Sequence, residues 1–499
     1  MPAQALATVA TLLAFAAHGD RVEFTLDHGS AELQWYSASA FRFRRTLEGP
    51  LPARPRPETA VAIHIDDAPG ALHVRSEAME VVIQKHGLLV TVLRSKGQPL
   101  MKDLSEPTES GRTPSPQGVV WEREAPAGER FYGLGPRPDP QFDLTGRAVQ
   151  AAIPLLISTA GYGEFHAGGG PWRFDFTAPG RYRIEAPRVD YFFYYGPPPR
   201  EIYREHYRAG QSSLPWQYTA AASWAGLRDA LLSMAQGAMS GVIYPSFDLA
   251  KFEGADAALK ARARQLGSLV PQVAAGAEGL SDFRRQLQSF FAVYGPEADS
   301  HGHPMWHPLP FQFPADPECA RHADEFMLGD EMLIAPITGA ADRRQVYLPQ
   351  GIWTNLETNQ VVPGRTTIAV ETPSLPVFAR NGTIIPLDEA GGMALHYFPK
   401  LGAEFFLLEE DIGEYSQVHA APAADSMRLE IESKKDRRYQ WVVHHVDRPA
   451  AVSFAGRAYR PVESLGALVD GTWFYDAGNR NLHIRVRVGA GEDCIINLL

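Results

Sequence analysis

The hydrophobic pattern of this chain changes period twice, and these two changes constrain its fold more than any other feature. From Arg21 onward, short runs alternate apolar and polar residues and end at Gly, Pro or Asp: VEFTL, AELQWYS, FRFRR, VAIHI, LHVRS, MEVVIQKH and LLVTVLRS. Alternation with a period of two is typical of half-buried β-strands. The N-terminal part is therefore predicted to be a β-sandwich.

The middle of the chain has helical spacing instead. In residues 224–239, Trp224, Leu227 and Leu231 fall on one stripe, and the apolar run GVIYPSF follows as a strand. Two further helical stretches come next, ADAALKARARQLGSLV and LSDFRRQLQSFFAVYG. After Ala335 the alternation returns, in runs such as QVYLP, TTIAVETP and YQWVVHHV. The pattern predicts a mostly β protein interrupted by one α/β segment.

The chain has 499 residues, which is too long for a single core at roughly 100–200 residues per domain. A hydrophobic content of 45% with 21% charged residues excludes disorder. The period changes predict four parts: an N-terminal β-sandwich at 1–213, an incomplete α/β segment at 214–325, and two C-terminal β-sandwiches at 326–388 and 389–499.

Net charge and cysteine usage exclude several classes of protein. The formal net charge of −11 leaves no basic excess for binding nucleic acid. Cys319 and Cys494 are the only cysteines, so neither a disulfide framework nor a cysteine metal site is expected. No run after the N-terminus approaches the ~20 apolar residues that a membrane span needs.

The N-terminus allows two interpretations. An apolar run from Ala5 to Ala17 contains small residues suited to signal-peptide cleavage, but it lacks the basic residues that normally precede such a run. The alternative is an ordinary first strand or helix of the sandwich. A secreted or periplasmic location and a cytoplasmic one both remain open.

Residues 302–338, GHPMWHPLPFQFPADPECARHADEFMLGDEMLIAPIT, carry the most specific motif of the chain. They closely resemble a segment that follows the catalytic centre in glycoside hydrolase family 31, the α-glucosidase and α-xylosidase family. The shared pattern is filled by Gly302, Pro304, Pro308, Leu309, Phe313, Pro314, Asp316, Phe326, Met327, Leu328, Gly329, Asp330, Ala335 and Pro336.

Motifs outside this segment extend the resemblance over roughly residues 125–210 and 224–490. They include Tyr132-Gly133-Leu134-Gly135, Gly161-Tyr162-Gly163, Gly196-Pro197, Arg380-Asn381-Gly382 and Leu408-Glu409-Glu410-Asp411. The resemblance implies a galactose-mutarotase-like N-terminal sandwich, a segment derived from a (β/α)8 TIM barrel, and two C-terminal sandwiches.

The residues that perform catalysis in the family are missing. Its nucleophile is an Asp in a Trp-x-Asp-Met-Asn tract, and this sequence contains no Asp-Met-Asn. Its acid lies a few residues before a Trp that opens a barrel helix; Trp224 resembles that Trp, but residues 218–223 hold no carboxylate. The barrel region, from Pro215 to about Ala315, has ~100 residues where ~250 are typical. A retaining glycosidase needs two carboxylates, so no catalytic residue can be assigned.

The resemblance implies four substrate-binding residues. Asp248 and Phe252 match a family Asp-Ile-Gly-Gly-Phe tract whose Asp binds sugar hydroxyls, although both glycines are absent. Arg262 matches the Arg of a family Arg-Trp pair, and His307 replaces the Arg of the family's Arg-Pro-Leu. The resemblance implies neither a metal nor a cofactor.

Asp248 has an alternative role, and two clusters outside this set are candidate metal sites. Asp248 could cap a helix rather than bind a ligand. His301, His303 and His307 lie close enough in sequence to suggest metal binding, but two intervening prolines prevent a regular helical ligand face. Glu409, Glu410 and Asp411 could bind calcium or form a solvated hairpin turn.

The sequence therefore indicates a family 31 homologue whose ligand is an α-linked glucoside or xyloside. Loss of the nucleophile and the acid predicts very weak or absent hydrolysis. The alternatives are a non-catalytic carbohydrate-binding pseudoenzyme and a structural partner of another chain. An incomplete barrel also exposes apolar surface, which we expect the N-terminal sandwich to cover, with a homodimer as the alternative.

Overall fold

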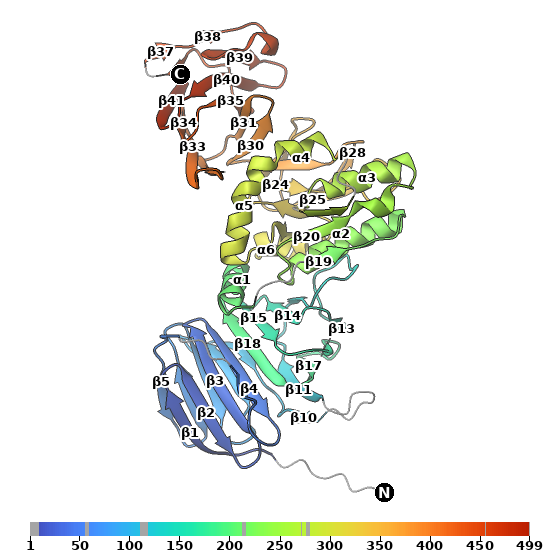
Figure 1. Ribbon diagram of the computed structural model, residues 1–499, viewed down its shortest axis with the longest axis vertical. Coiled ribbons are helices and arrows are strands. Elements are labelled where there is room, and N and C mark those ends of the chain that lie inside the picture. The colour runs from blue at the N-terminus through green and yellow to red at the C-terminus, as the bar shows by residue number, and fades with distance from the viewer. Residues whose placement is uncertain are drawn as a thin grey trace. The chain divides into compact units, whose positions relative to one another are not determined.

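The computed structural model describes residues 9–54, 59–109, 118–211, 216–270, 272–275, 280–454 and 456–498 (Figure 1). By content it is 44% strand and 15% helix, which confirms a mostly β protein. The chain divides into two compact units: unit 1 holds residues 1–214, 236–242 and 301–303, and unit 2 holds 215–235, 243–300 and 304–499.

Unit 1 is built from three antiparallel sheets. The largest has eight strands, in the order β1 (Leu12–His18), β2 (Arg21–Leu26), β3 (Ser30–Ser37), β4 (Ala40–Thr46), β18 (Val189–Tyr195), β15 (Tyr162–His166), β14 (Leu155–Ser158) and β12 (Phe131–Gly133). The second runs β10 (Thr108–Glu109), β11 (Val119–Glu124), β17 (Arg181–Ala186), β16 (Trp172–Asp175) and β13 (Ala148–Ala151). The third runs β5 (His64–Asp67), β6 (Ala71–Arg75), β7 (Met79–Gln84), β8 (Val90–Arg94) and β9 (Pro99–Lys102).

The alternating runs of the N-terminal sequence form the strands of unit 1, because every second side chain enters one shared core. Val22, Phe24 and Leu26 of β2 are buried while their neighbours are partly or fully exposed. Helix α1 (Pro199–Arg208) follows β18. Leu12–His18 pairs with β2 as strand β1, the second of the two interpretations of the N-terminus, and residues 1–8 lie outside the described residues.

Unit 2 begins with the α/β segment that the helical spacing predicted. Its three-stranded sheet, β19 (Trp216–Tyr218), β20 (Pro245–Asp248) and β21 (Gln272–Ala275), is parallel throughout. The helical elements are α2 (Trp224–Ala238), η1 (Leu249–Phe252), α3 (Ala257–Gly267), α4 (Asp282–Gln286) and α5 (Gln288–His301); the last residues of α2, from Gln236, and of α5, His301, are counted with unit 1. The sheets of the described residues include no closed eight-stranded barrel.

Two details differ from the expected pattern. The stretch LSDFRRQLQSFFAVYG forms two helices and not one. Helix α4 ends at Gln286, α5 begins at Gln288, and Leu287 between them is fully buried. Leu227 and Leu231 of the α2 stripe are fully buried, as is Phe247 of β20, whereas Trp224 is partly exposed. A second chain is not required to cover these residues, and the homodimer stays a prediction.

The remainder of unit 2 is β-rich. One six-stranded sheet has the order β22 (Trp306–Pro308), β23 (Phe326–Leu328), β24 (Met332–Ile334), β29 (Val377–Arg380), β26 (Ile352–Asn355) and β27 (Val361–Pro363), beside the pair β25 (Arg343–Leu348) and β28 (Thr366–Glu371). The short helices α6 (Leu309–Gln312) and η2 (Pro317–Arg321) precede β23. Met327, Leu333, Trp353 and Phe378 belong to the core of this part.

Two six-stranded sheets complete the chain. The first has the order β30 (Thr383–Glu389), β31 (Gly392–Phe398), β35 (Arg437–Val443), β40 (Asn481–Val488), β39 (Thr472–Asp476) and β38 (Arg460–Pro461). The second has the order β32 (Ala403–Glu409), β33 (Glu414–Pro422), β34 (Met427–Ser433), β41 (Glu492–Leu498), β36 (Val452–Phe454) and β37 (Arg457–Ala458). A short helix, η3 (Leu465–Ala467), lies between β38 and β39 in sequence. Cys319 and Cys494 are both buried and free. No described helix is long and apolar enough to cross a membrane.

Candidate functional site

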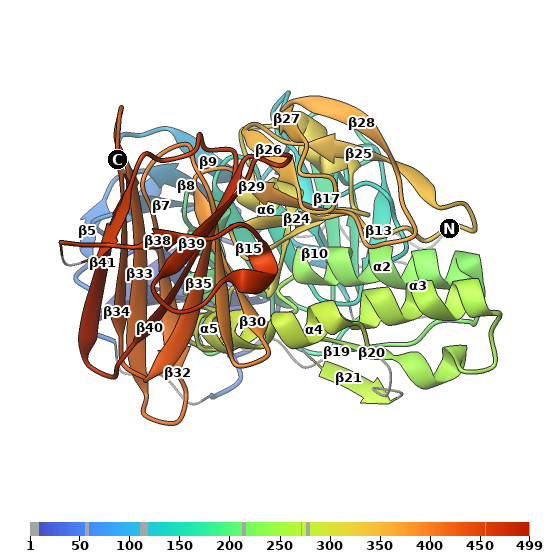
Figure 2. The ribbon, with the colours of Figure 1, turned by 90° about the horizontal axis from the view of Figure 1, so that it is seen from above.

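The parallel sheet of unit 2 has one apolar face and one polar face. Tyr218 and Phe247 are register partners on β19 and β20, and both are buried. Gln217 and Ser246, the next register pair, point to the opposite face because side chains alternate along a strand. Gln217 is exposed and Ser246 is partly exposed. Figure 2 shows α2 and α3 together on one side of the three strands, as expected for the apolar face.

Asp248 lies on the same polar face, at the carboxyl end of β20. Its Oδ1 accepts the backbone N–H of Ala250 at 3.1 Å, so the carboxylate caps η1 as the alternative interpretation expected. The side chain is only partly buried, and within the described residues Oδ2 has no hydrogen-bond partner. An ionised carboxylate can accept about four hydrogen bonds. The Asp248 carboxylate can therefore accept hydrogen bonds from a ligand while it caps η1. We call Gln217, Ser246 and Asp248 the open polar face.

The acids that follow Asp248 in sequence are bound to other groups. Glu253 pairs with Lys260 and with Arg264, the latter at 3.3 Å. The carboxylate of Asp256 caps α3 by accepting the N–H of Leu259 at 3.0 Å. One amide, one hydroxyl and one carboxylate can hydrogen-bond a polyol, whereas retaining hydrolysis needs a second carboxyl about 5–5.5 Å from the first.

Phe252 is buried beneath η1. Its ring packs against that of Phe247, with centroids 5.7 Å apart. The structure therefore brings Asp248 and Phe252 to the same end of β20, but it places the aromatic ring in the core rather than beside solvent. Its substrate-binding role stays a prediction.

Arg262 lies on α3, away from the open polar face. Its guanidinium donates to the carbonyl oxygens of Thr372, Pro373 and Ser374 at 3.0–3.1 Å and pairs with Asp342. The residue is only 5% exposed. These bonds tie α3 to the loop after β28, and the structure does not bring Arg262 together with Asp248.

His307 occupies a third location. His307 follows Met305 and Trp306, which both bond to the amino ends of the parallel strands. The Met305 N–H donates to the Ile243 carbonyl, just before β20, and the Trp306 indole donates to the Leu269 carbonyl, just before β21. Asp248 closes β20 at the opposite end, on the order of 15 Å away at about 3.3 Å per residue. The structure therefore separates His307 from Asp248.

The His307 ring takes part in a titratable cluster of unit 2. Nδ1 lies 3.4 Å from Asp330, and the ring meets that of Tyr294 edge-on at 6.3 Å. The Tyr294 hydroxyl is 2.8 and 3.0 Å from the two carboxyl oxygens of Glu331. Burial, together with the neighbouring Asp330 charge, raises the pKa of Glu331 to about 8.

Gly329 makes this cluster possible. Its φ is +60°, and an added Cβ would lie 2.5–2.6 Å from side-chain atoms of Glu331, Phe290 and Tyr294. Only glycine combines this backbone conformation with such close packing. The Gly-Asp of the 302–338 motif is therefore a packing requirement in this chain.

Two acidic clusters of unit 2 carry side chains of the kinds that bind metals. His322, Asp324 and Glu325 offer ligand atoms close together, but Arg344 Nη2 lies 3.0 Å from both carboxylates and supplies the balancing charge. In the turn after β32, Glu409 is buried and bound by Arg437 and Lys435, and Asp411 pairs with the same lysine. Protein cations already occupy these carboxylates.

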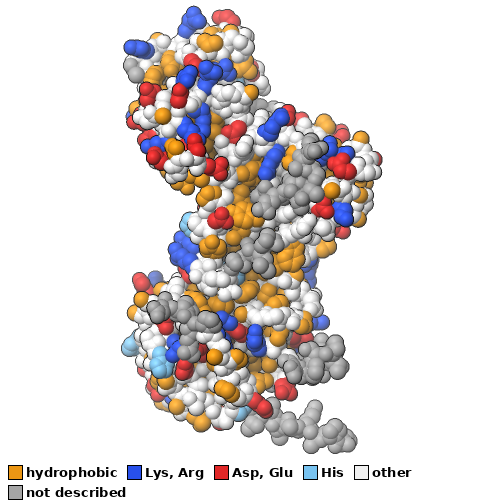
Figure 3. Space-filling model, in the orientation of Figure 1, with side chains coloured by type: hydrophobic (Ala, Val, Ile, Leu, Met, Phe, Trp, Pro, Cys, Tyr) orange, Lys and Arg blue, Asp and Glu red, His pale blue; other side chains and the backbone are white. Residues whose placement is uncertain are grey.

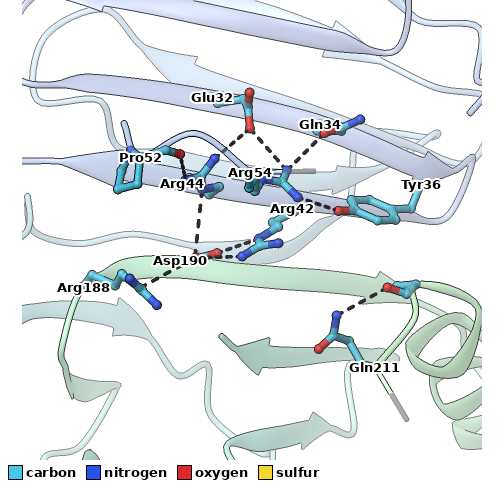
Figure 4. A network of polar contacts seen from close by, with 11 residues as sticks. Glu32, Gln34, Tyr36, Arg42, Arg44, Pro52, Arg54, Arg188, Asp190 and Gln211 are labelled. Carbon is cyan, nitrogen blue, oxygen red and sulfur yellow. Dashed lines mark hydrogen bonds and ion pairs between the residues drawn. The ribbon is translucent and has the colours of Figure 1, made fainter. Parts of the chain in front are cut away.

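Unit 1 has a polar sheet face of its own, on β3, β4 and β18 (Figure 4). Glu32, Arg44 and Asp190 form one cross-strand row. Arg42 donates to both Asp190 oxygens at 2.6 and 2.8 Å, and Arg54 reaches Glu32 at 3.2 Å. Each of the two carboxylates contacts more than one guanidinium, so we call this face a closed ion-pair network.

The comparisons with known proteins agree with this architecture. Residues 302–385 match the family model described as the glycosyl hydrolase family 31 C-terminal domain. An α-glucosidase of Saccharolobus solfataricus is 38% identical over 92 residues, which cover 18% of this chain and 13% of that protein. An isomaltosyltransferase of Sporosarcina globispora is 22% identical over 340 residues, covering 56% and 31%. The matched stretches span less than a third of either relative.

Solved structures show the same fold. A family 31 dextranase of Flavobacterium johnsoniae, a mutant complexed with isomaltotriose, aligns with a TM-score of 0.83 at 13% identity, covering 98% of this chain and 100% of that chain. A family 31 α-xylosidase from a soil metagenome, complexed with xylose, aligns with a TM-score of 0.60 at 13% identity, covering 74% and 98%.

Residues 302–385 identify the chain as a homologue of glycoside hydrolase family 31, as its motifs predicted.

Proposed function

We propose that this chain binds α-linked glucosides or xylosides on the open polar face of its parallel sheet and does not hydrolyse them at ordinary enzyme rates. The observation that carries the proposal is Asp248, a partly exposed carboxylate at the carboxyl end of a parallel strand, with Oδ2 unpartnered within the described residues. Ligands of α/β sheets bind at this end of the strands.

The neighbouring side chains suit a neutral polyol. Gln217 offers an amide and Ser246 a hydroxyl on the same face as the Asp248 carboxylate. Amides and carboxylates supply the donors and acceptors that sugar hydroxyls match. Relatives in the family support the ligand class, since one is named an α-glucosidase and structural neighbours carry isomaltotriose and xylose.

The absence of hydrolysis follows from the missing second carboxylate. The acids closest in sequence, Glu253 and Asp256, are bound to Lys260, Arg264 and the backbone of α3. Without a nucleophile and an acid on either side of the glycosidic bond, covalent and general-acid catalysis are both lost.

The domain arrangement is part of the same proposal. The three parallel strands represent the surviving units of a barrel between an N-terminal sandwich at 1–213 and C-terminal sandwiches at 326–388 and 389–499. In an eight-stranded barrel the inner face is packed with side chains. A polar, solvated inner face such as that of Gln217 and Ser246 is what an unclosed sheet requires.

The other predicted residues take supporting roles in this proposal. Phe252 underlies the capped turn that orients Asp248, and Arg262 fixes α3 to the loop after β28. His307 belongs to the Glu331 cluster. Only Asp248 of the four would contact the sugar.

A panel of chromogenic α-glucosides and α-xylosides tests the catalytic half of the proposal. We expect release of chromophore at the rate of the protein-free blank, with an active α-glucosidase as the positive control. Turnover at ordinary enzyme rates that Asp248→Asn abolishes would show that Asp248 is catalytic and would refute the proposal.

A further inference from the structure

A polar cavity lies in the last part of unit 2, at one end of the sheet that contains β31, β35 and β40. It has a volume of about 400 Å³ and is lined by Gly391, Gly392, Asp436, Arg437, Arg438 and Arg487. Arg438 and Arg487 are register partners on β35 and β40, so they lie side by side. A volume in this range accommodates a ligand the size of a monosaccharide.

The cavity wall carries excess positive charge. Three guanidiniums line it, whereas Asp436 is its only carboxylate. The acids that pair with the other two arginines lie outside the lining: Glu409 holds Arg437 at 2.7 Å, and Asp470 holds Arg438 at 3.0 Å. Each of the three arginines is therefore paired with one carboxylate, and two of these three carboxylates lie outside the lining. Figure 3 shows Lys and Arg side chains interspersed with Asp and Glu on the part of the chain that contains these sheets.

Several guanidinium donors remain available. Arg438 donates to Asp470 through Nε alone, and within the described residues its two Nη groups have no protein acceptor. Arg487 donates to Asp436 through Nε and Nη2 at 2.8 and 2.7 Å, which leaves Nη1. The planar fork of arginine matches the oxygens of carboxylates, phosphates and sulfates.

The lining is less suited to the neutral sugars of the proposed function than to an anion. It contains no aromatic or aliphatic side chain on which a sugar ring could stack. Gly392 has no room for a Cβ, because a built one would lie 2.4 Å from the Arg438 carbonyl oxygen. The backbone of the Gly391–Gly392 turn therefore approaches the arginines closely and leaves the cavity open.

We propose that this cavity is an anion site for a small ligand that carries a carboxylate, phosphate or sulfate group. The site is independent of the open polar face and recognises its ligand by charge. Within a carbohydrate-binding protein it would select an acidic or esterified sugar over a neutral one.

Calorimetric titration of the full chain at low ionic strength tests the proposal, with inorganic phosphate, inorganic sulfate, glucuronate and glucose as separate probes. We expect at least one anion to bind and glucose not to bind at this cavity. Glucuronate differs from glucose by its carboxylate, so this pair isolates the charge. The three anions separate carboxylate, phosphate and sulfate as the natural group.

Variants locate the binding. Arg438→Gln and Arg487→Gln are each expected to weaken anion affinity about tenfold, since each removes a charge-assisted donor. Asp436→Asn is expected to strengthen it, because a competing carboxylate is removed. Arg480→Gln, which breaks an exposed pair with Asp447 outside the lining, is the matched control and should change nothing.

Three results would overturn the proposal: no heat with any of the anions, an anion affinity unaffected by the double change Arg438→Gln and Arg487→Gln, or an affinity lowered by Asp436→Asn. Glucose binding on the open polar face would be unaffected by all of these variants and is tested separately with Asp248→Asn.

Discussion

The protein has two polar sheet faces, one whose side chains are buried in ion pairs and one whose side chains remain exposed. On β3, β4 and β18 of unit 1, Glu32, Arg44 and Asp190 are buried and share their charges within one ion-pair network. On β19 and β20 of unit 2, Gln217, Ser246 and Asp248 remain at least partly exposed. Both faces arise from the same alternation of side chains along a strand. They differ in whether the protein itself supplies the partners.

This difference separates structural polar groups from binding groups. A buried carboxylate without partners costs several kcal/mol, so Asp190 must be paired for unit 1 to fold. Water can satisfy Asp248 in the absence of a ligand, and a sugar hydroxyl can replace that water. The closed face is expected to govern stability, and the open face is expected to govern binding.

Loss of Asp190 should give the largest effect on stability. Asp190→Ala leaves Arg42 without its bidentate partner and also removes the charge near Arg44 and Arg188. We expect the free energy of unfolding to fall by about 3–5 kcal/mol, measured by urea titration followed through intrinsic fluorescence. Asp447→Ala, which removes a carboxylate that is 94% exposed, is the control. Equal midpoints for the two variants would contradict the closed network.

The Glu331 carboxyl should make stability depend on pH. Its pKa in the folded protein is about 8, above the ordinary value of 4.5, because the protonated form is favoured in the buried cluster. Its stabilising contribution is therefore complete below about pH 4.5 and is lost as the pH rises to about 8. Burial also raises the pKa of Glu325 to about 8, against the opposing effect of the Arg344 charge, so this carboxyl titrates in the same pH range.

Glu331→Gln removes this titration. We expect the wild type to lose on the order of 4 kcal/mol relative to Glu331→Gln between pH 5 and pH 9, at about 1.4 kcal/mol per pKa unit. Thermal melts of both proteins across that range measure the difference. A constant difference between them at all pH values would show that Glu331 is not the titrating group.

Arg262 distinguishes a structural clamp from a sugar ligand. Arg262→Met leaves the carbonyls of Thr372, Pro373 and Ser374 without this donor, which should lower the free energy of unfolding by about 2–3 kcal/mol. Arg264→Met, which removes an exposed ion pair on the same helix, should cost under about 1 kcal/mol. If Arg262→Met instead abolished sugar binding at unchanged stability, Arg262 would belong to the site.

Asp248 should have the smallest effect on stability. Asn caps helices about as well as Asp, so Asp248→Asn is expected to change the free energy of unfolding by a few tenths of a kcal/mol, and Asp248→Ala by about 1 kcal/mol. The same urea titration measures both. A loss of several kcal/mol in Asp248→Asn would place this carboxylate with the closed network and not with the open face.

Local sequence patterns predicted the secondary structure and domain order well, but they predicted few of the side-chain contacts. The switch from alternation to helical spacing located β20 and α2, and the motif at 302–338 identified the family. The capping role of Asp248 was one of two local alternatives, and the structure contains it. Gln217 and Ser246 could have been found from the alternation in WQY and PSFD.

Long-range contacts could not be read from the sequence. Arg262 bonds to carbonyls 110–112 residues away, and Tyr294 meets Glu331 across 37 residues. The periodicity of a sequence does not indicate such contacts, because they depend on how whole helices and strands pack against one another. For the same reason, the sequence could not tell that His307 and Asp248 lie at opposite ends of the parallel strands.

The central claim is that the open polar face binds an α-linked sugar without cleaving it. Calorimetric titration with an α-linked glucose disaccharide, followed by recovery of the ligand, tests this most directly. We predict saturable binding by the wild type, about tenfold weaker binding by Asp248→Asn, and recovery of the intact disaccharide. Equal affinity in the two proteins, or recovery of free glucose, would contradict the account.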